Sequence, residues 1–227
     1  MKNSLWLFDI DGTLVDTGGA GMSALVDATR EVFGSDGPEL DLAGATDSGL
    51  LIGIYRAFER DADDETTALF YERYLEHLEQ NLADPCFGGR PLEGATSLLA
   101  EMEEAGYHKG LLTGNIAAGA EAKMRAYGMA HHFRFGAFGD DHHERDRLGP
   151  IALERAEREF GKAFAAKDVF VIGDTPKDIR CAKAIDAKSV AVATGRFTFD
   201  ELKQAGADLV LESLDSPDEF FARVSLL

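Results

Sequence analysis

The sequence has only two cysteines, Cys86 and Cys181, and they lie far apart in the chain. They show none of the paired spacing of a disulfide framework, so we expect a reducing compartment, the cytoplasm. Long apolar runs are also missing, since none approaches the roughly 20 residues that a membrane-spanning helix needs. The apolar run at residues 5–8 is too short for a signal peptide. We therefore expect no membrane-embedded segment.

Basic residues are scarce: 23 lysines and arginines stand against 41 acidic residues, for a formal net charge of −18. A surface of that sign repels nucleic acid and anionic lipid, and no basic stripe compensates for it. We therefore expect neither nucleic acid nor a membrane as a partner. Phosphorylated ligands are repelled at long range too. Any phosphate site must be built locally, from a metal ion, backbone amides and a few cations.

The 227 residues are 45% hydrophobic, which suits an ordinary globular protein. Short β-rich runs alternate with longer helical patterns, and this alternation is typical of a parallel sheet. The sequence therefore predicts an α/β fold with a doubly wound, Rossmann-like sheet. The expected strands are Leu5–Phe8, Lys109–Leu112, Val169–Ile172, Ser189–Ala193 and Asp208–Leu211, with a weaker one near Phe133–Phe138.

Residues 17–90 break this alternation, because they contain three helical patterns and no convincing strand. Turn-forming residues bracket the segment, with glycines at 18, 19 and 21 on one side and at 88 and 89 on the other. We expect an all-helical cap domain over residues 17–90, inserted into a catalytic core of residues 1–16 and 91–227. The glycine-rich joints favour a mobile lid that sets specificity.

Polar residues that could take part in catalysis or binding follow the predicted strands. Asp9 and Asp11 come after the first strand, Thr113-Gly114-Asn115 after the second, and Asp174 and Asp178 after the third. The carboxyl ends of parallel strands share one edge of a sheet, so we expect one common site there. Two carboxylates two residues apart can divide the work of nucleophile and acid/base if their environments separate their pKa values.

In order and spacing, these motifs resemble the haloacid dehalogenase superfamily, in its phosphatase branch with a helical cap after the first strand (the phosphoglycolate phosphatase-like group). The resemblance implies a magnesium-dependent phosphatase that acts on small phosphate monoesters, that is, on phosphorylated metabolites. It implies that Asp9 is the nucleophile and forms an aspartyl-phosphate. It also implies that Asp11 is the general acid and base.

The resemblance further implies a ligand set. Mg²⁺ would be held by the carboxylates of Asp9 and Asp174 and by the backbone carbonyl of Asp11, while Asp178 would orient metal-bound waters. The phosphoryl group would be bound by Thr113, the amides of Gly114 and Asn115, a helix N-terminus near Asn115, and one cation.

Arg147 is the expected cation, because its spacing to Pro150 and Ala156 matches the lysine that the superfamily usually has there. Arg145 and Lys177 are the alternatives. In the cap, Arg56 is a candidate to meet a second anionic group of the substrate. Thr46 and Asp47 are candidates to meet its hydroxyls.

Two other functions stay open. A phosphomutase of the same superfamily would use the same aspartyl-phosphate, and a receiver module would also combine an acidic pocket with a phosphorylated aspartate. A receiver would be about half this length and would lack the helical insert. A dehalogenase would lack the second aspartate, and a phosphonate hydrolase would need a cap lysine, of which residues 18–90 have none. The motifs do not reveal the substrate or the oligomeric state.

Overall fold

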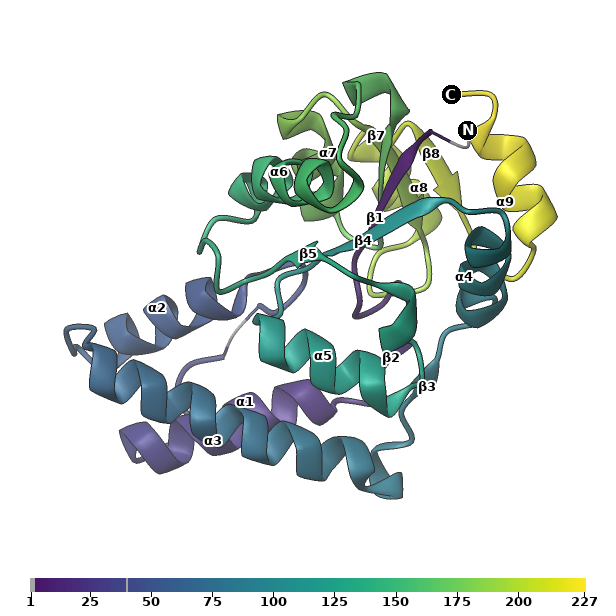
Figure 1. Cartoon of the computed structure of the whole chain (residues 1–227). Helices are drawn as coiled ribbons and strands as arrows, with labels where there is room; N and C mark the ends of the chain where they lie inside the picture. The colour runs from purple at the N-terminus through teal and green to yellow at the C-terminus, as the bar shows by residue number, and fades with distance from the viewer. Residues whose placement is uncertain (1–2, 40) are drawn as a thin grey trace.

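A six-stranded parallel sheet forms the centre of the molecule in the computed structural model, which describes residues 3–39 and 41–227 (Figure 1). Its strand order is β5-β4-β1-β6-β7-β8, and every neighbouring pair is parallel. The predicted fold class is confirmed. The strands are β1 (Leu5–Phe8), β4 (His108–Leu112), β5 (Gly136–Ala137), β6 (Val169–Gly173), β7 (Lys188–Val192) and β8 (Leu209–Leu211).

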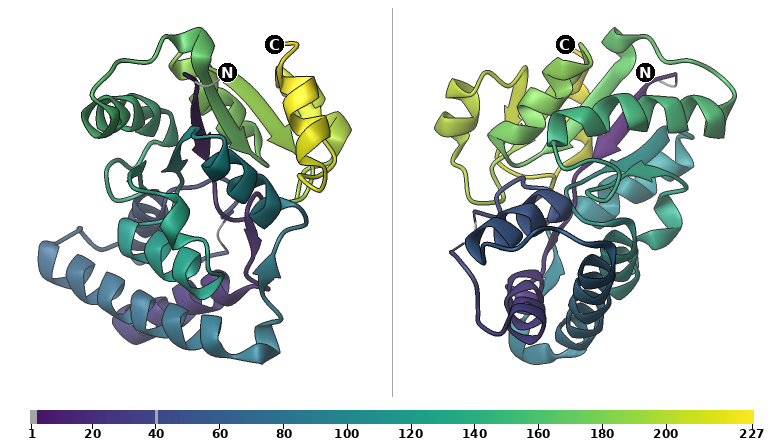
Figure 2. Two further views of the ribbon diagram at one scale, coloured as in Figure 1. Left: turned by 45° about the vertical axis from the view of Figure 1, so that its right-hand side comes forward. Right: turned by 90° about the vertical axis from the view of Figure 1, so that its left-hand side faces the viewer.

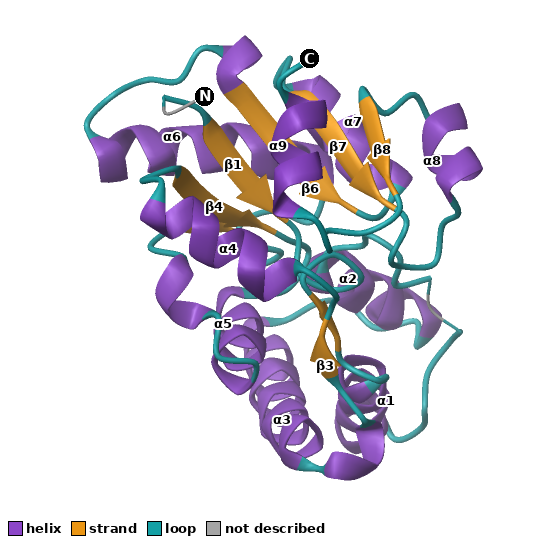
Figure 3. Ribbon diagram, turned by 90° about the vertical axis from the view of Figure 1, so that its right-hand side faces the viewer, coloured by secondary structure: helices purple, strands orange, loops and turns teal. Residues whose placement is uncertain are grey.

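Both faces of the sheet are buried, and β1 shows why its sequence is apolar throughout. Trp6 and Phe8 point into one core cluster, whereas Leu5 and Leu7 point into the other. Helices cover each face and place the sheet between two layers (Figure 3). Helices α4 (Ala95–Glu104) and α9 (Pro217–Val224) pack on the first cluster, α6 (Leu148–Phe160) and α7 (Pro176–Ala184) on the second, and α8 (Phe199–Gln204) beside β8.

A helical unit extends from the carboxyl end of the sheet. It consists of α1 (Ala20–Phe33), α2 (Asp47–Ala57), α3 (Asp64–Ala83) and the 3₁₀ helix η1 (Pro85–Phe87). It has its own apolar core, to which Leu25, Ile54 and Phe70 contribute. The core helix α5 (Ala117–Ala126) packs against α3, so the unit rests on the core through this helix (Figure 2).

Two short antiparallel strands, β2 (Val15–Asp16) and β3 (Arg90–Pro91), carry the chain into and out of the helical unit. Gly18 lies at this junction with a φ of 62°, and a Cβ there would lie 1.7 Å from the carbonyl oxygen of Phe87. Only glycine allows the two crossing segments to come so close.

The weak strand expected near residues 133–138 is reduced to two residues, Gly136–Ala137. It ends there because the Phe138 N–H donates to the Asp141 carboxylate, which Arg155 also binds at 2.6 Å. The remaining elements are the short 3₁₀ helices η2 (Ala130–His132), η3 (Arg145–Arg147) and η4 (Ala166–Asp168). Within the described ranges, the structure has no helix long and apolar enough to cross a bilayer.

Candidate active site

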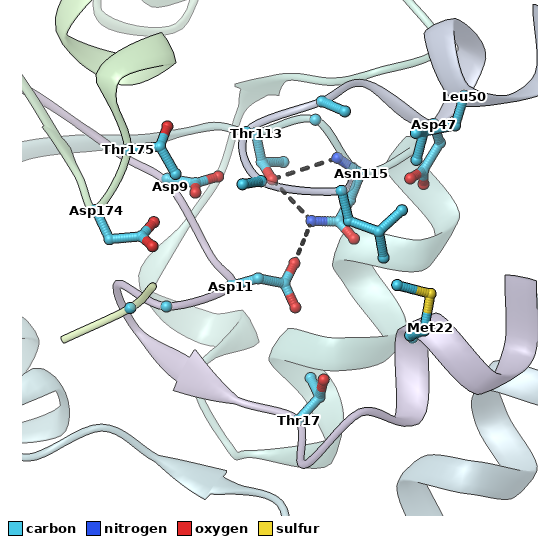
Figure 4. Close-up of a pocket in the computed structure, with 18 of the residues that line it drawn as sticks. Asp9, Asp11, Thr17, Met22, Asp47, Leu50, Thr113, Asn115, Asp174 and Thr175 are labelled. Carbon is cyan, nitrogen blue, oxygen red and sulfur yellow. Dashed lines mark hydrogen bonds between the residues drawn. The ribbon is translucent and has the colours of Figure 1, made fainter. Parts of the chain in front are cut away.

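The three central strands deliver their polar residues to one cavity of about 540 Å³ (Figure 4). Asp9 follows β1, Thr113 follows β4 and Asp174 follows β6, and β1 lies between the other two strands. Adjacent parallel strands end at the same edge, so these side chains converge although more than 160 residues separate the first from the last. Of the predicted residues, Asp11, Gly114 and Asn115 also line this cavity.

A tight turn after β1 brings Asp11 beside this edge. The Ile10 carbonyl accepts the N–H groups of residues 13, 14 and 15, which reverses the chain at once. Gly12 adopts a φ of 78°, and a Cβ on it would lie 2.4 Å from the Asp174 carboxylate. The Thr13 hydroxyl donates to the same carboxylate at 3.4 Å. Glycine at position 12 therefore lets the loops after β1 and β6 approach each other.

Three buried carboxylates form the centre of the site. Asp9, Asp174 and Asp178 each offer an oxygen, and these oxygens lie within 4.8 Å of one another. The Arg145 guanidinium contacts two of the three groups: Nη2 lies 3.0 Å from Asp9 Oδ1 and also donates to Asp178 Oδ1. The other Asp178 oxygen accepts from the N–H and hydroxyl of Thr175, which completes a capping box at the start of α7.

This cluster lacks positive charge. Burial raises the pKa of Asp174, and the neighbouring carboxylates of Asp178 and Asp9 raise it further. Burial also raises the pKa of Asp9, although Arg145 opposes the shift. One guanidinium thus faces three carboxylates. Mg²⁺ prefers oxygen ligands, and these carboxylates carry more negative charge than Arg145 balances. The residues present therefore fit this ion.

Arg147 is not the cation at this site, and its predicted placement was wrong. Its side chain is 69% exposed and lies 3.6 Å from Glu144. Arg145, one of the two alternatives, is buried against Asp9 instead. Both arginines belong to the 3₁₀ helix η3, in which residues turn by about 120° each, so side chains two positions apart point in different directions.

Lys123 is a site residue that the sequence reasoning missed. Its ammonium group is buried in the cavity wall and donates to both Asp11 oxygens, at 2.8 and 2.7 Å, and to Asn115 Oδ1 at 2.6 Å. The available signal was a lysine on the apolar face of α5, between Gly119 and Met124, where a charged residue needs a partner.

The loop after β4 holds Asp11 from the other side. The Asn115 amide Nδ2 donates to Asp11 Oδ2 at 2.7 Å and to the Thr113 hydroxyl at 2.8 Å (Figure 4). Helix α5 begins two residues later than expected, at Ala117. The N–H groups of Ile116 and Ala117 donate to the carboxylates of Asp47 and Asp140. Those two groups are therefore not offered to a phosphate.

The loop before α2 lies directly on this site. The Asp47 N–H donates to the Gly114 carbonyl at 2.7 Å, and a Cβ on Gly114 would lie 1.7 Å from the Ala45 carbonyl oxygen. Asp47 lines the cavity, and burial raises its pKa to about 6, although Lys123 opposes the shift. The helical unit therefore touches the chemistry-bearing loops directly.

The other two predicted cap residues do not line the cavity. Thr46 is buried. Its hydroxyl accepts from the Gly49 N–H, which caps α2, and donates to the His143 carbonyl at 2.6 Å. Arg56 lies in the last turn of α2 with its side chain exposed. The structure therefore places neither of these two predicted residues in the cavity. Helical spacing alone did not reveal which face of α2 meets the cavity.

The fold is an α/β fold with paired aspartates after the first strand of its parallel sheet. A cluster of carboxylates beside them could hold a metal ion. The sequence model of the haloacid dehalogenase-like hydrolases matches residues 6–192, and the chain belongs to this family. The expected superfamily and the expectation of an enzyme are both confirmed.

Named relatives cover almost the whole chain. An N-acetylmuramic acid 6-phosphate phosphatase of Pseudomonas aeruginosa is 29% identical over 93% of this chain and 92% of its own length. A phosphoglycolate phosphatase of Rhodospirillum rubrum is 28% identical over 92% of this chain and 87% of its own. A hydrolase of Pseudomonas syringae shares the fold, with a TM-score of 0.75 at 21% identity over 97% of this chain and 98% of that one.

Proposed function

We propose that the protein is a magnesium-dependent phosphatase that hydrolyses small phosphate monoesters with Asp9 as nucleophile. The observation that carries the proposal is the pairing of two carboxylates in different surroundings at one sheet edge. Asp9 is buried beside Arg145 and the other acidic groups, whereas the Asp11 carboxylate is held by Lys123 and Asn115. Different surroundings suit the two carboxylates to different roles. Phosphatases among the relatives support the same reaction class.

The reaction has two steps. An Asp9 carboxylate oxygen attacks phosphorus, and the bond from phosphorus to the ester oxygen breaks while the Asp11 carboxyl group donates its proton to that oxygen. The products are the free alcohol and an aspartyl-phosphate. A water then attacks phosphorus and gives a proton to Asp11, and the bond to Asp9 breaks. Phosphate leaves, and both aspartates return to their starting states.

Arg145 and the Thr113 loop would bind the phosphoryl oxygens. Arg145 Nη2 is engaged by carboxylates, but its buried Nε has no hydrogen-bond partner among the described residues. A buried donor without a partner costs free energy, which a phosphoryl oxygen would recover. Mg²⁺ held by Asp9, Asp174 and the Asp11 carbonyl would supply the positive charge that lowers repulsion between the anionic nucleophile and the anionic ester.

Lys123 has a positioning role in this proposal. Because its ammonium group binds both oxygens of Asp11, it fixes the carboxyl group at the side of the cavity away from Asp174. Asn115 holds the same group from the loop after β4. A general acid must lie within hydrogen-bond reach of the oxygen that it protonates, so fixing Asp11 favours the first step.

We further propose that residues 17–90 form a cap that closes over the bound ester. The contact between the Asp47 N–H and the Gly114 carbonyl joins this segment to the phosphate-binding loop. The glycines at the β2–β3 junction provide joints about which the cap can rotate. A closed cap excludes bulk water from Asp9 and admits only compact substrates.

The test is release of p-nitrophenol from its phosphate ester. We expect turnover with Mg²⁺, loss of turnover with a chelator, and an inactive but folded Asp9→Asn variant. Full activity of Asp9→Asn would overturn the nucleophile assignment. A phosphomutase would instead need a sugar bisphosphate to stay active and would isomerise a sugar phosphate without net release of phosphate.

A further inference from the structure

The far side of the cavity, where the helical unit faces the catalytic carboxylates, carries apolar side chains together with Asp47. Figure 4 shows Met22 and Leu50 on the opposite side of Asp11 from Asp174. In an in-line displacement the departing oxygen leaves on the side away from the nucleophile. The alcohol released from the ester therefore lies against this wall. Residues 17–90 supply the larger apolar side chains of the cavity lining, called the wall below, namely Met22, Leu25, Leu42, Leu50 and Tyr74.

Three cations line the cavity among the residues that the structure describes, namely Lys123, Arg145 and Arg196. The Lys123 ammonium group has three donors, and Asp11 and Asn115 together accept three hydrogen bonds from it. It therefore has no further hydrogen-bond donor to offer a substrate.

The other two cations also contact carboxylates. Arg145 is held by the carboxylates at the phosphate end of the cavity. Arg196 lies at the rim with its side chain 72% exposed and 3.0 Å from the Asp41 carboxylate. Because both side chains are exposed, solvent screens their charges, and Arg196 adds little positive potential inside the cavity.

Carboxylates add to the negative potential of the cavity. Asp16, Asp41 and Asp47 all line it in addition to the catalytic aspartates. A second anionic group on the substrate would therefore be repelled and would find no free cation in the described part of the wall. The first turn of α1 contributes backbone N–H groups beside Met22. A helix N-terminus favours an anion, but the surrounding carboxylates oppose that preference, and the same N–H groups can donate to a hydroxyl or carbonyl oxygen.

We propose that the preferred substrate carries its phosphate as its only anionic group, on an uncharged alcohol with an apolar face. Phosphoglycolate, whose alcohol carries a carboxylate, is then a poor substrate of this chain. The proposal rests on the phosphatase activity proposed above and adds a substrate class to it. Burial of an apolar group against the wall supplies the binding free energy that a second ion pair would supply elsewhere.

Two esters of matched shape test the inference. Isobutyl phosphate and 2-phosphoglycolate have the same heavy-atom skeleton but differ in the charge of the alcohol. We expect kcat/KM for isobutyl phosphate to exceed that for phosphoglycolate at least about tenfold, which corresponds to roughly 1.4 kcal/mol. O-phosphoethanolamine, with a cationic alcohol, serves as a third ester. The acidic lining attracts its ammonium group, but placing that group against apolar side chains removes its hydration, so we expect less efficient hydrolysis than for the neutral ester.

A charge introduced at the wall should weaken the preference. Met22→Lys places a cation beside the alcohol and should raise the ratio of kcat/KM for phosphoglycolate over isobutyl phosphate about tenfold. Leu69→Lys is the matched control, because Leu69 and Met22 are both 40% exposed but Leu69 lies on α3 and does not line the cavity. It should leave the ratio unchanged.

The outcomes separate the two proposals. If no ester, including p-nitrophenyl phosphate, is hydrolysed in an Asp9-dependent manner, the phosphatase assignment fails. If hydrolysis depends on Asp9 but the wild type prefers phosphoglycolate or phosphoethanolamine, the phosphatase assignment stands and the inference of an uncharged alcohol is overturned. The same holds if Met22→Lys and Leu69→Lys shift the ratio equally.

Discussion

Replacing the two arginines of η3 one at a time compares the buried Arg145, the proposed phosphate-binding cation, with the exposed Arg147 two residues away. Arg145 is 6% exposed and contacts Asp9 and Asp178, whereas the Arg147 side chain is 69% exposed beside Glu144. Removing one preorganised charge that stabilises a transition state typically costs about 10²–10³ in rate. We expect Arg145→Met to lose kcat by that factor and Arg147→Met to stay within about twofold of wild type, because exposed ion pairs contribute little.

The same pair of variants should differ in stability. Removing one partner of a buried ion pair costs about 3–5 kcal/mol, because the remaining charges are left uncompensated. Arg145→Met should therefore lower the Tm strongly in the presence of a chelator, and Mg²⁺ should recover part of the loss, since it binds the same carboxylates. Arg147→Met should leave the Tm nearly unchanged under both conditions.

Phosphate release at saturating Mg²⁺ measures kcat, and thermal unfolding with and without the ion measures the Tm. Arg145→Lys keeps the charge but not the forked geometry, so it should recover only part of the rate. The reasoning is refuted if Arg145→Met folds and keeps the wild-type kcat, or if Arg147→Met is the more damaging change.

The remaining predictions concern Lys123 and Asp47. Lys123→Met frees Asp11 and should lower kcat about 10- to 100-fold with a smaller change in KM, which is the scale expected for a misplaced catalytic group. Lys123→Arg should recover part of the lost kcat. An equal loss in both variants would contradict the positioning role. The pKa of Asp47 is raised from 3.8 to about 6 in the folded state. The folded state therefore binds the carboxyl proton more tightly than the unfolded state, and the contribution of Asp47 to stability falls as pH rises from about 4 to 6. Asp47→Asn should therefore be more stable than wild type near pH 7, by at most about 3 kcal/mol at roughly 1.4 kcal/mol per pKa unit, and equally stable near pH 4. Denaturant unfolding of both proteins at the two pH values measures the difference in stability. A difference that does not change with pH would contradict the prediction.

The sequence predicts the sheet well, because strands buried on both faces are continuous apolar runs. β1 was predicted with its observed bounds, and the strands β4, β6, β7 and β8 within one residue at each end. The placement of Asp9, Asp11, Thr113 and Asp174 at one edge followed from strand order alone, since parallel strands end together.

What the sequence did not predict depends on side-chain direction. Spacing placed the cation at Arg147, but a 3₁₀ turn directs Arg145 inward and Arg147 outward. Lys123 belongs to the site because the packing of α5 against two core clusters directs this side chain to the cavity, which no local motif records. In the same way, helical periodicity identified α2 but did not distinguish the exposed Arg56 from the cavity-lining Leu50.

Covalent capture of the phosphorylated enzyme tests the central claim most directly. The enzyme would be mixed with a phosphate monoester and Mg²⁺, quenched in acid during turnover and treated with hydroxylamine, which converts an aspartyl-phosphate to a hydroxamate. Peptide mass spectrometry would then locate the modified residue. We expect the hydroxamate at Asp9, its absence at Asp11, and no modification without substrate. A hydroxamate at another residue, or none while Asp9→Asn still turns over, would contradict the account.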